Sequence, residues 1–139
     1  GFVGDIAEIN SSFISALLDQ DITPVFSPIS CTLDGELLNT NGDSVAAELA
    51  ISLSSNYETE LYFCFEKKGV LEDAADDESV IESLDPKKYK AFLDEKVISD
   101  GMLPKLYNSF QALERGVSKI CLGDSTLLQK HSKHTKILK

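Results

Sequence analysis

The stretch LLNTNGDSVAAELA, residues 37–50, places three small polar side chains where an apolar helical pattern begins. Asn39, Asn41 and Asp43 precede Val45 and Leu49, which recur at the spacing of one helix face. A helix over residues 41–54 needs only one of the three polar residues as its N-cap. The other two therefore suggest a functional role.

The segments around this helix start alternate between helix and strand patterns. Residues 10–20 predict a helix, and residues 22–30 predict a strand that Pro24 and Pro28 weaken, because proline donates no ladder hydrogen bond. Asp34-Gly35 is typical of a hairpin turn.

The second half of the chain continues this alternation. Residues 60–65 predict a strand covered on both faces, Asp85-Pro86 begins a helix, and another helix runs from near Gly101 to Gly116. Residues 117–123 predict a strand, and residues 135–138 a short edge strand. The helix after Gly101 is expected to bury Leu103, Leu106, Tyr107, Phe110 and Leu113.

Strands separated by helices in this way predict an α/β fold. We expect one domain over residues 1–139, a three-layer α/β/α sandwich with a mainly parallel sheet. In such sheets ligands bind outside the carboxyl ends of the strands. The polar segment before the helix over residues 41–54 is expected at that edge.

Composition narrows the class of protein. A net charge of −10 argues against nucleic-acid binding, and no apolar run approaches the roughly 18 residues of a membrane span. The chain starts GFVGDI without methionine, which predicts a removed leader or a fragment of a longer protein. The chain has an odd number of cysteines, Cys31, Cys64 and Cys121, which favours a reducing, cytoplasmic compartment. Cys64 and Cys121 are expected to be buried.

Charge is unevenly distributed along the chain. The acidic residues of segment 72–78 and the lysines of segment 130–139 are interpreted as a solvated loop and tail. His131 and His134 have the spacing of helical metal ligands but no evident third ligand, so we assign them to the same solvated tail.

A second helix start, ISDGMLPK at residues 98–105, is also polar. Helix N-termini attract phosphate, and Lys105 lies one turn inside this helix. Asp43 is suited to orient the Lys105 ammonium group. Phosphoryl transfer requires such a positioned positive charge. The simpler interpretation is that Asn41 and Asp100 cap two helices and that Lys105 is a surface lysine.

The motifs GFVG, LLNTNGDSVAAELA, KKGVL and ISDGMLPK resemble, in this order and spacing, the C-terminal half of the acetylglutamate kinases. These enzymes belong to the amino acid kinase family. The resemblance covers essentially all 139 residues, and the two helix-start motifs together are specific for this member of the family.

The resemblance implies roles for individual residues. Lys105 matches the lysine that stabilises the transferring phosphoryl group, and Asp43 the aspartate that organises catalytic lysines. Asn39 matches the asparagine that hydrogen-bonds the acylated glutamate; Asn41 joins it in the predicted substrate-binding set and is also free to cap the helix. The residues implied to surround ATP are Glu66, Lys67, Lys68, Gly69, Val70, Leu71, Val97, Ile98, Ser99, Gly101 and Met102.

The implied reaction transfers the γ-phosphoryl group of ATP to the side-chain carboxylate of N-acetylglutamate, or another N-acylglutamate, in arginine biosynthesis. Mg²⁺ is expected to arrive with the nucleotide, without a metal site of the protein itself. The implied full-length enzyme is a cytoplasmic homo-oligomer that binds neither nucleic acid nor membrane.

Two departures from the family pattern affect this interpretation. The N-terminal half, with its glycine-rich loops, a further catalytic lysine and a substrate-binding arginine, has no counterpart here, so the chain alone is expected to be inactive. The nucleotide loop usually reads [ST]-D-x-x-G, whereas residues 65–69 read FEKKG. Lys67 and Lys68 either contact phosphates in compensation or are solvated.

Two other functions remain open from the sequence. The first is a non-catalytic nucleotide- or effector-binding module of the same fold, which the altered loop and absent half favour. The second is another amino acid kinase that acts on aspartate, glutamate or UMP. Intact Asp43 and Lys105 oppose the first of these alternatives.

Overall fold

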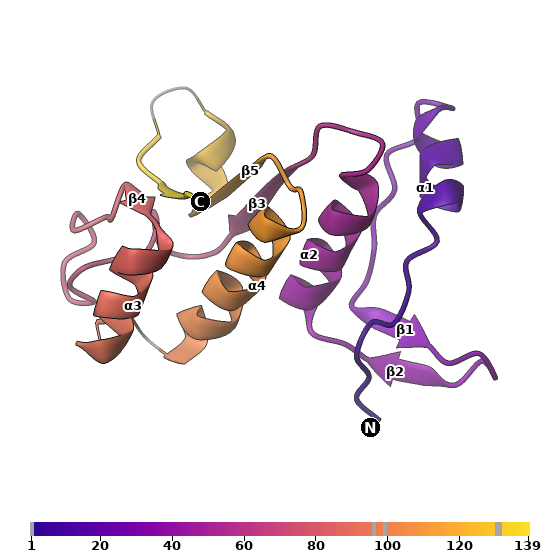
Figure 1. The fold of residues 1–139 in the computed structure, drawn as a ribbon, viewed down its shortest axis with the longest axis horizontal. Helices are drawn as coiled ribbons and strands as arrows, with labels where there is room; N and C mark the ends of the chain where they lie inside the picture. Colours follow the sequence, from indigo (N-terminus) through magenta and orange to yellow (C-terminus); the bar gives the residue numbers. More distant parts are fainter. Residues whose placement is uncertain (1, 96, 99, 130–131) are drawn as a thin grey trace.

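Two separate sheets organise the chain (Figure 1). The computed structural model describes residues 2–95, 97–98, 100–129 and 132–139. A two-stranded sheet lies in the N-terminal part and a four-stranded sheet in the rest. In chain order the elements are α1 (Ser11–Leu18), β1 (Ile29–Cys31), β2 (Leu37–Asn39), α2 (Gly42–Leu53), β3 (Glu60–Cys64), β4 (Ser83–Leu84), α3 (Pro86–Asp94), the 3₁₀ helix η1 (Asp100–Met102), α4 (Leu103–Glu114), β5 (Lys119–Gly123), the 3₁₀ helix η2 (Ser125–Leu128) and β6 (Thr135–Ile137).

The four-stranded sheet has the order β3-β5-β6-β4. β3 pairs with β5 in parallel, β4 pairs with β6 in parallel, and β5 pairs with β6 antiparallel. The predicted α/β class with a mainly parallel sheet is confirmed. The prediction that residues 135–138 form an edge strand is wrong, because β6 lies between β5 and β4. The short strand β4, which the sequence pattern did not reveal, occupies the edge instead.

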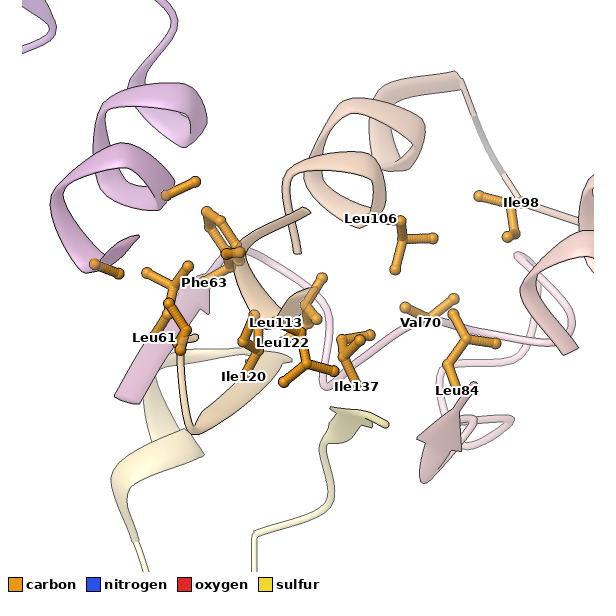
Figure 2. Packing of buried hydrophobic residues seen from close by; sticks show 14 residues of the cluster. Leu61, Phe63, Val70, Leu84, Ile98, Leu106, Leu113, Ile120, Leu122 and Ile137 are labelled. Carbon is orange, nitrogen blue, oxygen red and sulfur yellow. The ribbon is translucent and has the colours of Figure 1, made fainter. Parts of the chain in front are cut away.

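One face of this sheet forms the core against α2 and α4 (Figures 1 and 2). Alternate residues of a strand point to the same face, so Leu61 and Phe63 of β3 align with Ile120 and Leu122 of β5. From the helix side, Leu106 of α4 is fully buried in the same cluster. Apolar burial here is the main stabilising contribution to the fold.

The opposite face of the sheet is covered less completely. Gly123 lies on this face, and a Cβ atom there would come within 3.1 Å of the Leu127 side chain, so η2 packs over the end of β5. Cys121 is fully buried, as predicted. Cys64 is exposed, and the predictions that it is buried and that its strand is covered on both faces are wrong. The reason is that β3 is an edge strand and that Cys64 lies on the sheet face opposite α2 and α4.

The N-terminal sheet is a hairpin with its predicted turn at Asp34-Gly35. Gly35 has φ +88°, a left-handed conformation that glycine adopts without steric cost. The predicted strand over residues 22–30 is largely wrong, because only Ile29–Cys31 pairs. Pro24 and Pro28 account for this loss, since neither can donate to a ladder. Val3 adds a parallel bridge to Asn39, at the start of the chain.

The starts of α2 and α3 and the end of α4 follow signals in the sequence, whereas α4 begins after Met102 without a side-chain cap. Asn41 Oδ1 accepts a hydrogen bond from Ser44 N at 3.1 Å, and Asp85 caps α3 in the same way. Gly116, with φ +111°, follows the end of α4 as predicted. Thus local chemistry explains the boundaries of these helices.

The buried face of α4 differs from the expected one at one residue. Tyr107 is 61% exposed, whereas Leu106 is fully buried, so the predicted burial of Tyr107 is wrong. One helical residue rotates the side chain by about 100°, which is enough to turn Tyr107 from the core toward solvent. None of the described helices is long and apolar enough to traverse a lipid bilayer.

This difference between neighbouring residues predicts different effects on stability. Leu106→Ala should lower the free energy of unfolding by about 2–5 kcal/mol, because it removes fully buried methyl groups and leaves a cavity. Tyr107→Ala, the matched control on the exposed side, should change it by less than about 0.5 kcal/mol. Urea denaturation of both variants measures the difference. Equal losses would contradict the orientation of α4.

Candidate functional site

The carboxyl edge of the parallel strands β3 and β5 carries the candidate site. α2 precedes β3 and α4 precedes β5, so each helix runs back along the sheet before its strand begins. The two strands are parallel, and the two helices are therefore parallel as well. Their N-terminal turns consequently lie at the same edge of the sheet, where ligands bind in folds of this class.

Asp43 and Lys105 meet at this edge as an ion pair. Lys105 Nζ lies 2.8 Å from Asp43 Oδ1 and 2.6 Å from Oδ2, and both side chains are 23% exposed. Asp43 lies in the first turn of α2, and Lys105 lies in the first turn of α4. The predicted convergence of these two side chains, 62 positions apart, is confirmed, and their catalytic roles stay predictions.

The ion pair fixes the direction of the ammonium group. Two carboxylate oxygens accept from one Nζ, so the lysine is held against α2 while part of it remains accessible to solvent. The free N–H groups of the two helix N-termini add positive potential nearby. The arrangement can bind an anionic group at the surface of the pair.

Two polar neighbours lie near the pair, one bonded across the two helices and one within α4. Asn108 Nδ2 donates to Ser44 Oγ at 3.4 Å, one turn along from Lys105. The buried Ser109 donates to the Lys105 carbonyl at 2.7 Å. Sequence reasoning missed Asn108, although its position three residues after Lys105 places it on the same helix face.

The two predicted substrate-binding asparagines have different surroundings. Asn41 uses its side-chain oxygen as the cap of α2. The exposed Asn39 ends β2, and its backbone bonds to Phe2 and Gly4 in the first strand-like segment. Between them Thr40 is buried, with its hydroxyl 2.7 Å from that of Ser30. The segment is therefore firmly held, and the substrate-binding role of the two asparagines stays a prediction.

A separate pocket of about 100 Å³ gathers most of the predicted nucleotide residues. Its walls are mainly apolar and come from two segments, one after β3 and one before α4. Ala74 also lines it and was not predicted from the sequence. Such walls suit the flat, weakly polar faces of a heteroaromatic base. The predicted residues that line the pocket are Lys67, Gly69, Val70, Leu71, Val97, Ile98 and Met102.

Three of the other predicted nucleotide residues lie outside the pocket wall. Glu66, Lys68 and Gly101 are not in the pocket wall, and Ser99 falls outside the described residues. Phe65, which replaces the usual hydroxyl residue of this loop, packs against the hydrophobic core. The phenyl ring at residue 65, which departs from the family pattern, is thus accommodated by hydrophobic packing.

Lys67 and Lys68 pair with the acidic loop that follows them. Lys67 Nζ lies 2.6 Å from Asp77, and Lys68 donates to Glu78. Lys133 also reaches Glu78, at 2.9 Å. The prediction that segment 72–78 is solvated is confirmed, since its acidic side chains are exposed, but it also supplies partners for two of the lysines considered for phosphate binding.

No group of three histidine, cysteine or acidic side chains is arranged to hold a metal ion within the described parts of the chain. His134 Nδ1 lies 2.9 Å from the carbonyl of Ser132, and His131 falls outside the described residues. His134 is half-buried at this contact rather than part of a fully solvated tail.

The N-terminal part presents an apolar groove of about 740 Å³ between α1, the hairpin and α2. Ile6, Ile9, Phe26, Leu38 and Val45 contribute to its lining. Large apolar side chains continue over the surrounding surface, which is the signature of an interface rather than of a solvated face. Those exposed are Phe2, Val3, Phe13, Leu18, Ile22, Val25, Phe26, Ile29, Leu33 and Leu37.

Comparison with known proteins agrees with these features. Residues 1–124 match the model of a family described as the amino acid kinase family. An acetylglutamate kinase of Phocaeicola vulgatus is 43% identical, over 94% of this chain and 54% of its own length. The chain therefore spans about half the length of the curated relatives it matches. The resemblance found in the sequence motifs is confirmed.

Solved structures give the same fold. A Streptococcus mutans protein matches with a TM-score of 0.83 and 29% identity, over 99% of this chain and 51% of its own. The N-acetylglutamate synthase of Neisseria gonorrhoeae also reaches a TM-score of 0.83, over 100% of this chain and 33% of its own. At 19% identity the latter likeness concerns the fold alone.

The ion pairs of the acidic loop predict a lowered pKa for Glu78, which can be measured. Hydrogen bonds from Lys68 and Lys133 lower the pKa of Glu78 from 4.5 to about 2. Because the folded-state pKa is below the unfolded one, these pairs stabilise the loop above about pH 4.5 and are lost as the pH falls through about 2. A carboxyl-carbon NMR titration should show this value.

Replacement of Lys68 and Lys133 tests whether they cause the lowered pKa of Glu78. Lys68→Met with Lys133→Met should return the pKa of Glu78 toward 4.5, whereas Lys90→Met on α3 should leave it low. A pKa of Glu78 near 4.5 in the unaltered chain would exclude the paired loop.

Proposed function

Because the chain belongs to the amino acid kinase family, we propose that it is the nucleotide-binding half of an acetylglutamate kinase. The complete enzyme would phosphorylate the side-chain carboxylate of N-acetylglutamate, or a similar N-acylglutamate, at the expense of ATP. The similarity to curated acetylglutamate kinases supports the substrate class. The ion pair of Asp43 and Lys105 is the single observation that carries the proposal.

The proposed chemistry explains why a directed lysine is needed. The attacking carboxylate and the phosphoryl group are both anionic, so they repel each other until cationic donors neutralise them. Lys105 would donate to an oxygen of the phosphoryl group in transit. Asp43 would hold the ammonium charged and aimed, so that little reorganisation is needed during transfer.

The apolar pocket is the proposed site for the nucleotide base. Val70, Ile98 and Met102, which line the pocket, would pack against the base. ATP supplies the transferable phosphoryl group, and Mg²⁺, carried by its phosphates, supplies further charge neutralisation. Lys67 and Lys68 would reach phosphates only by exchanging their acidic partners, Asp77 and Glu78.

We propose that the other half of the kinase packs into the apolar groove of the N-terminal part. The relatives are about twice as long as this chain, and the exposed apolar surface is concentrated in residues 2–37. Packing a second lobe there would bury that surface and place its own catalytic groups beside β2 and the start of α2.

The cellular setting proposed for the enzyme follows from composition and family. Free Cys31, Cys64 and Cys121 suit the reducing cytoplasm, and a net charge of −10 disfavours nucleic acid as a partner. We propose a homo-oligomer in the complete protein, active in arginine biosynthesis and without membrane association.

Reconstitution tests the proposed activity. The chain should be co-expressed with the N-terminal half of the Phocaeicola vulgatus relative, and ADP release measured with N-acetylglutamate as acceptor. Aspartate, glutamate and UMP serve as competing acceptors. Release with N-acetylglutamate alone supports the proposal, and preference for another acceptor assigns a different amino acid kinase. ATP binding without turnover in a stable complex would favour a non-catalytic module.

Lys105→Ala in the active assembly should reduce turnover by about 10²–10³-fold, because it removes one preorganised donor to the phosphoryl group. Lys90→Ala, an exposed lysine on α3, is the matched control and should leave turnover unchanged. Steady-state ADP release measures both. A Lys105→Ala enzyme with near-normal turnover would disprove the assigned role.

Ala74→Leu should raise KM for ATP severalfold with little change in kcat, because the added methyl groups enter the pocket from its loop side. Ala75→Leu provides the control, since Ala75 is the adjacent loop residue and does not line the pocket. Titration of ATP at saturating acceptor gives both constants. Equal behaviour of the two variants would place the nucleotide elsewhere.

A further inference from the structure

We propose that Thr135 is a positioning residue that holds the nucleotide pocket in shape. It lies in β6, outside residues 1–124 that match the family model, and 65 positions from the pocket residue it contacts. The inference rests on the proposed nucleotide role of that pocket. Its structural basis is a buried hydroxyl group that joins two ends of one loop.

The Thr135 hydroxyl makes two hydrogen bonds. Oγ1 accepts from Val70 N at 2.8 Å and donates to Ile81 O at 2.6 Å. Thr135 is fully buried, and Val70 is nearly so. Val70 lies in the pocket wall, so the first of these bonds fixes part of the pocket directly.

The same hydroxyl closes the neck of the acidic loop. Ile81 N donates back to Val70 O at 2.8 Å, and Leu71 forms a bridge with Val80. These contacts bring the start and end of segment 70–81 together, and Thr135 joins the two sides at the base. Ala74 and the partners of Lys67 and Lys68 all lie on the loop that emerges from this neck.

Gly69 shows how closely this contact is fitted. A Cβ atom at residue 69 would lie 2.7 Å from Thr135 Oγ1 and 3.1 Å from Thr135 N. Any other side chain would therefore push β6 away from the pocket segment. The close approach of Gly69 and the hydrogen bond of Val70 act on the same side of the pocket.

A core role alone does not explain a threonine here. The neighbouring residues on this face are apolar, including Ile137 in β6 itself and Leu84 in β4, and a valine would fill the same volume without a buried hydroxyl. The hydroxyl is required because Val70 presents a buried N–H for which Thr135 Oγ1 is the partner. An unpaired buried N–H is costly, so without the hydroxyl Val70 would shift to find another partner.

The experiment uses three variants in the active assembly of both halves. Thr135→Val keeps the shape and removes the hydroxyl, Thr135→Ser keeps the hydroxyl, and Ile137→Val removes one buried methyl group from the same strand as a stability control. KM for ATP, KM for N-acetylglutamate, kcat and Tm are measured for each variant.

Thr135→Val should raise KM for ATP by about tenfold, the effect of one lost hydrogen bond. We expect kcat and KM for N-acetylglutamate to stay within about twofold, since Asp43 and Lys105 lie on other elements. Thr135→Ser should restore KM for ATP to within about twofold of the unaltered value, and Ile137→Val should lower Tm without raising that KM. A normal KM for ATP in Thr135→Val, an equal rise in Ile137→Val, or failure of Thr135→Ser to restore it would overturn the inference.

Amide hydrogen exchange of Val70, measured on this chain without nucleotide, separates the inference from the proposed function. Faster exchange at Val70 in Thr135→Val, restored in Thr135→Ser, is expected even if the assembly has no kinase activity. An unaltered assembly that neither binds ATP nor turns over would refute the proposed function. Unchanged protection of Val70 in Thr135→Val would refute the positioning role itself.

Discussion

The parallel alignment of α2 and α4 is the constraint on which the candidate site depends. Each helix leads into one of two adjacent parallel strands, so their N-terminal turns must lie at the same edge of the sheet. Contacts run in register along the pair, from Asp43–Lys105 at one end to Ser54 and Arg115 at the other. The half-buried ion pair is thus a consequence of sheet topology. Its electrostatic value comes from partial burial, since a fully exposed pair would contribute little directionality.

The pocket after β3 is built on a different principle. Its segment has few ladder partners and is held instead by contacts from distant parts of the chain: Thr135 at its base, Gly123 beneath it, and surface ion pairs at its outer end. The buried hydrogen bonds and the exposed ion pairs differ in strength, because water and salt screen only the latter. The base of the loop is therefore the rigid part, and its acidic end is the part that solution conditions can alter.

The N-terminal part contrasts with both regions. Its hairpin and α1 bury few of their apolar side chains, and Phe13 and Phe26 face solvent beside a large groove. Burial of such side chains elsewhere in the protein contributes most of the stability. The proposed second lobe would complete this part of the structure in the same way, by covering apolar side chains that are exposed here.

Local chemistry in the sequence determined the helix caps at Asn41 and Asp85 and the turn at Gly35. The family motifs in the sequence were also sufficient to link Asp43 with Lys105. These features depend on a few adjacent residues, which is why patterns reveal them. Tertiary structure alone decided the place of β6, the exposure of Cys64 and Tyr107, the pairing of Lys67 and Lys68 with acidic partners, and the bond from Val70 to Thr135. Each of these depends on which distant segment becomes a neighbour, and that is set by the packing of the whole sheet rather than by any local pattern.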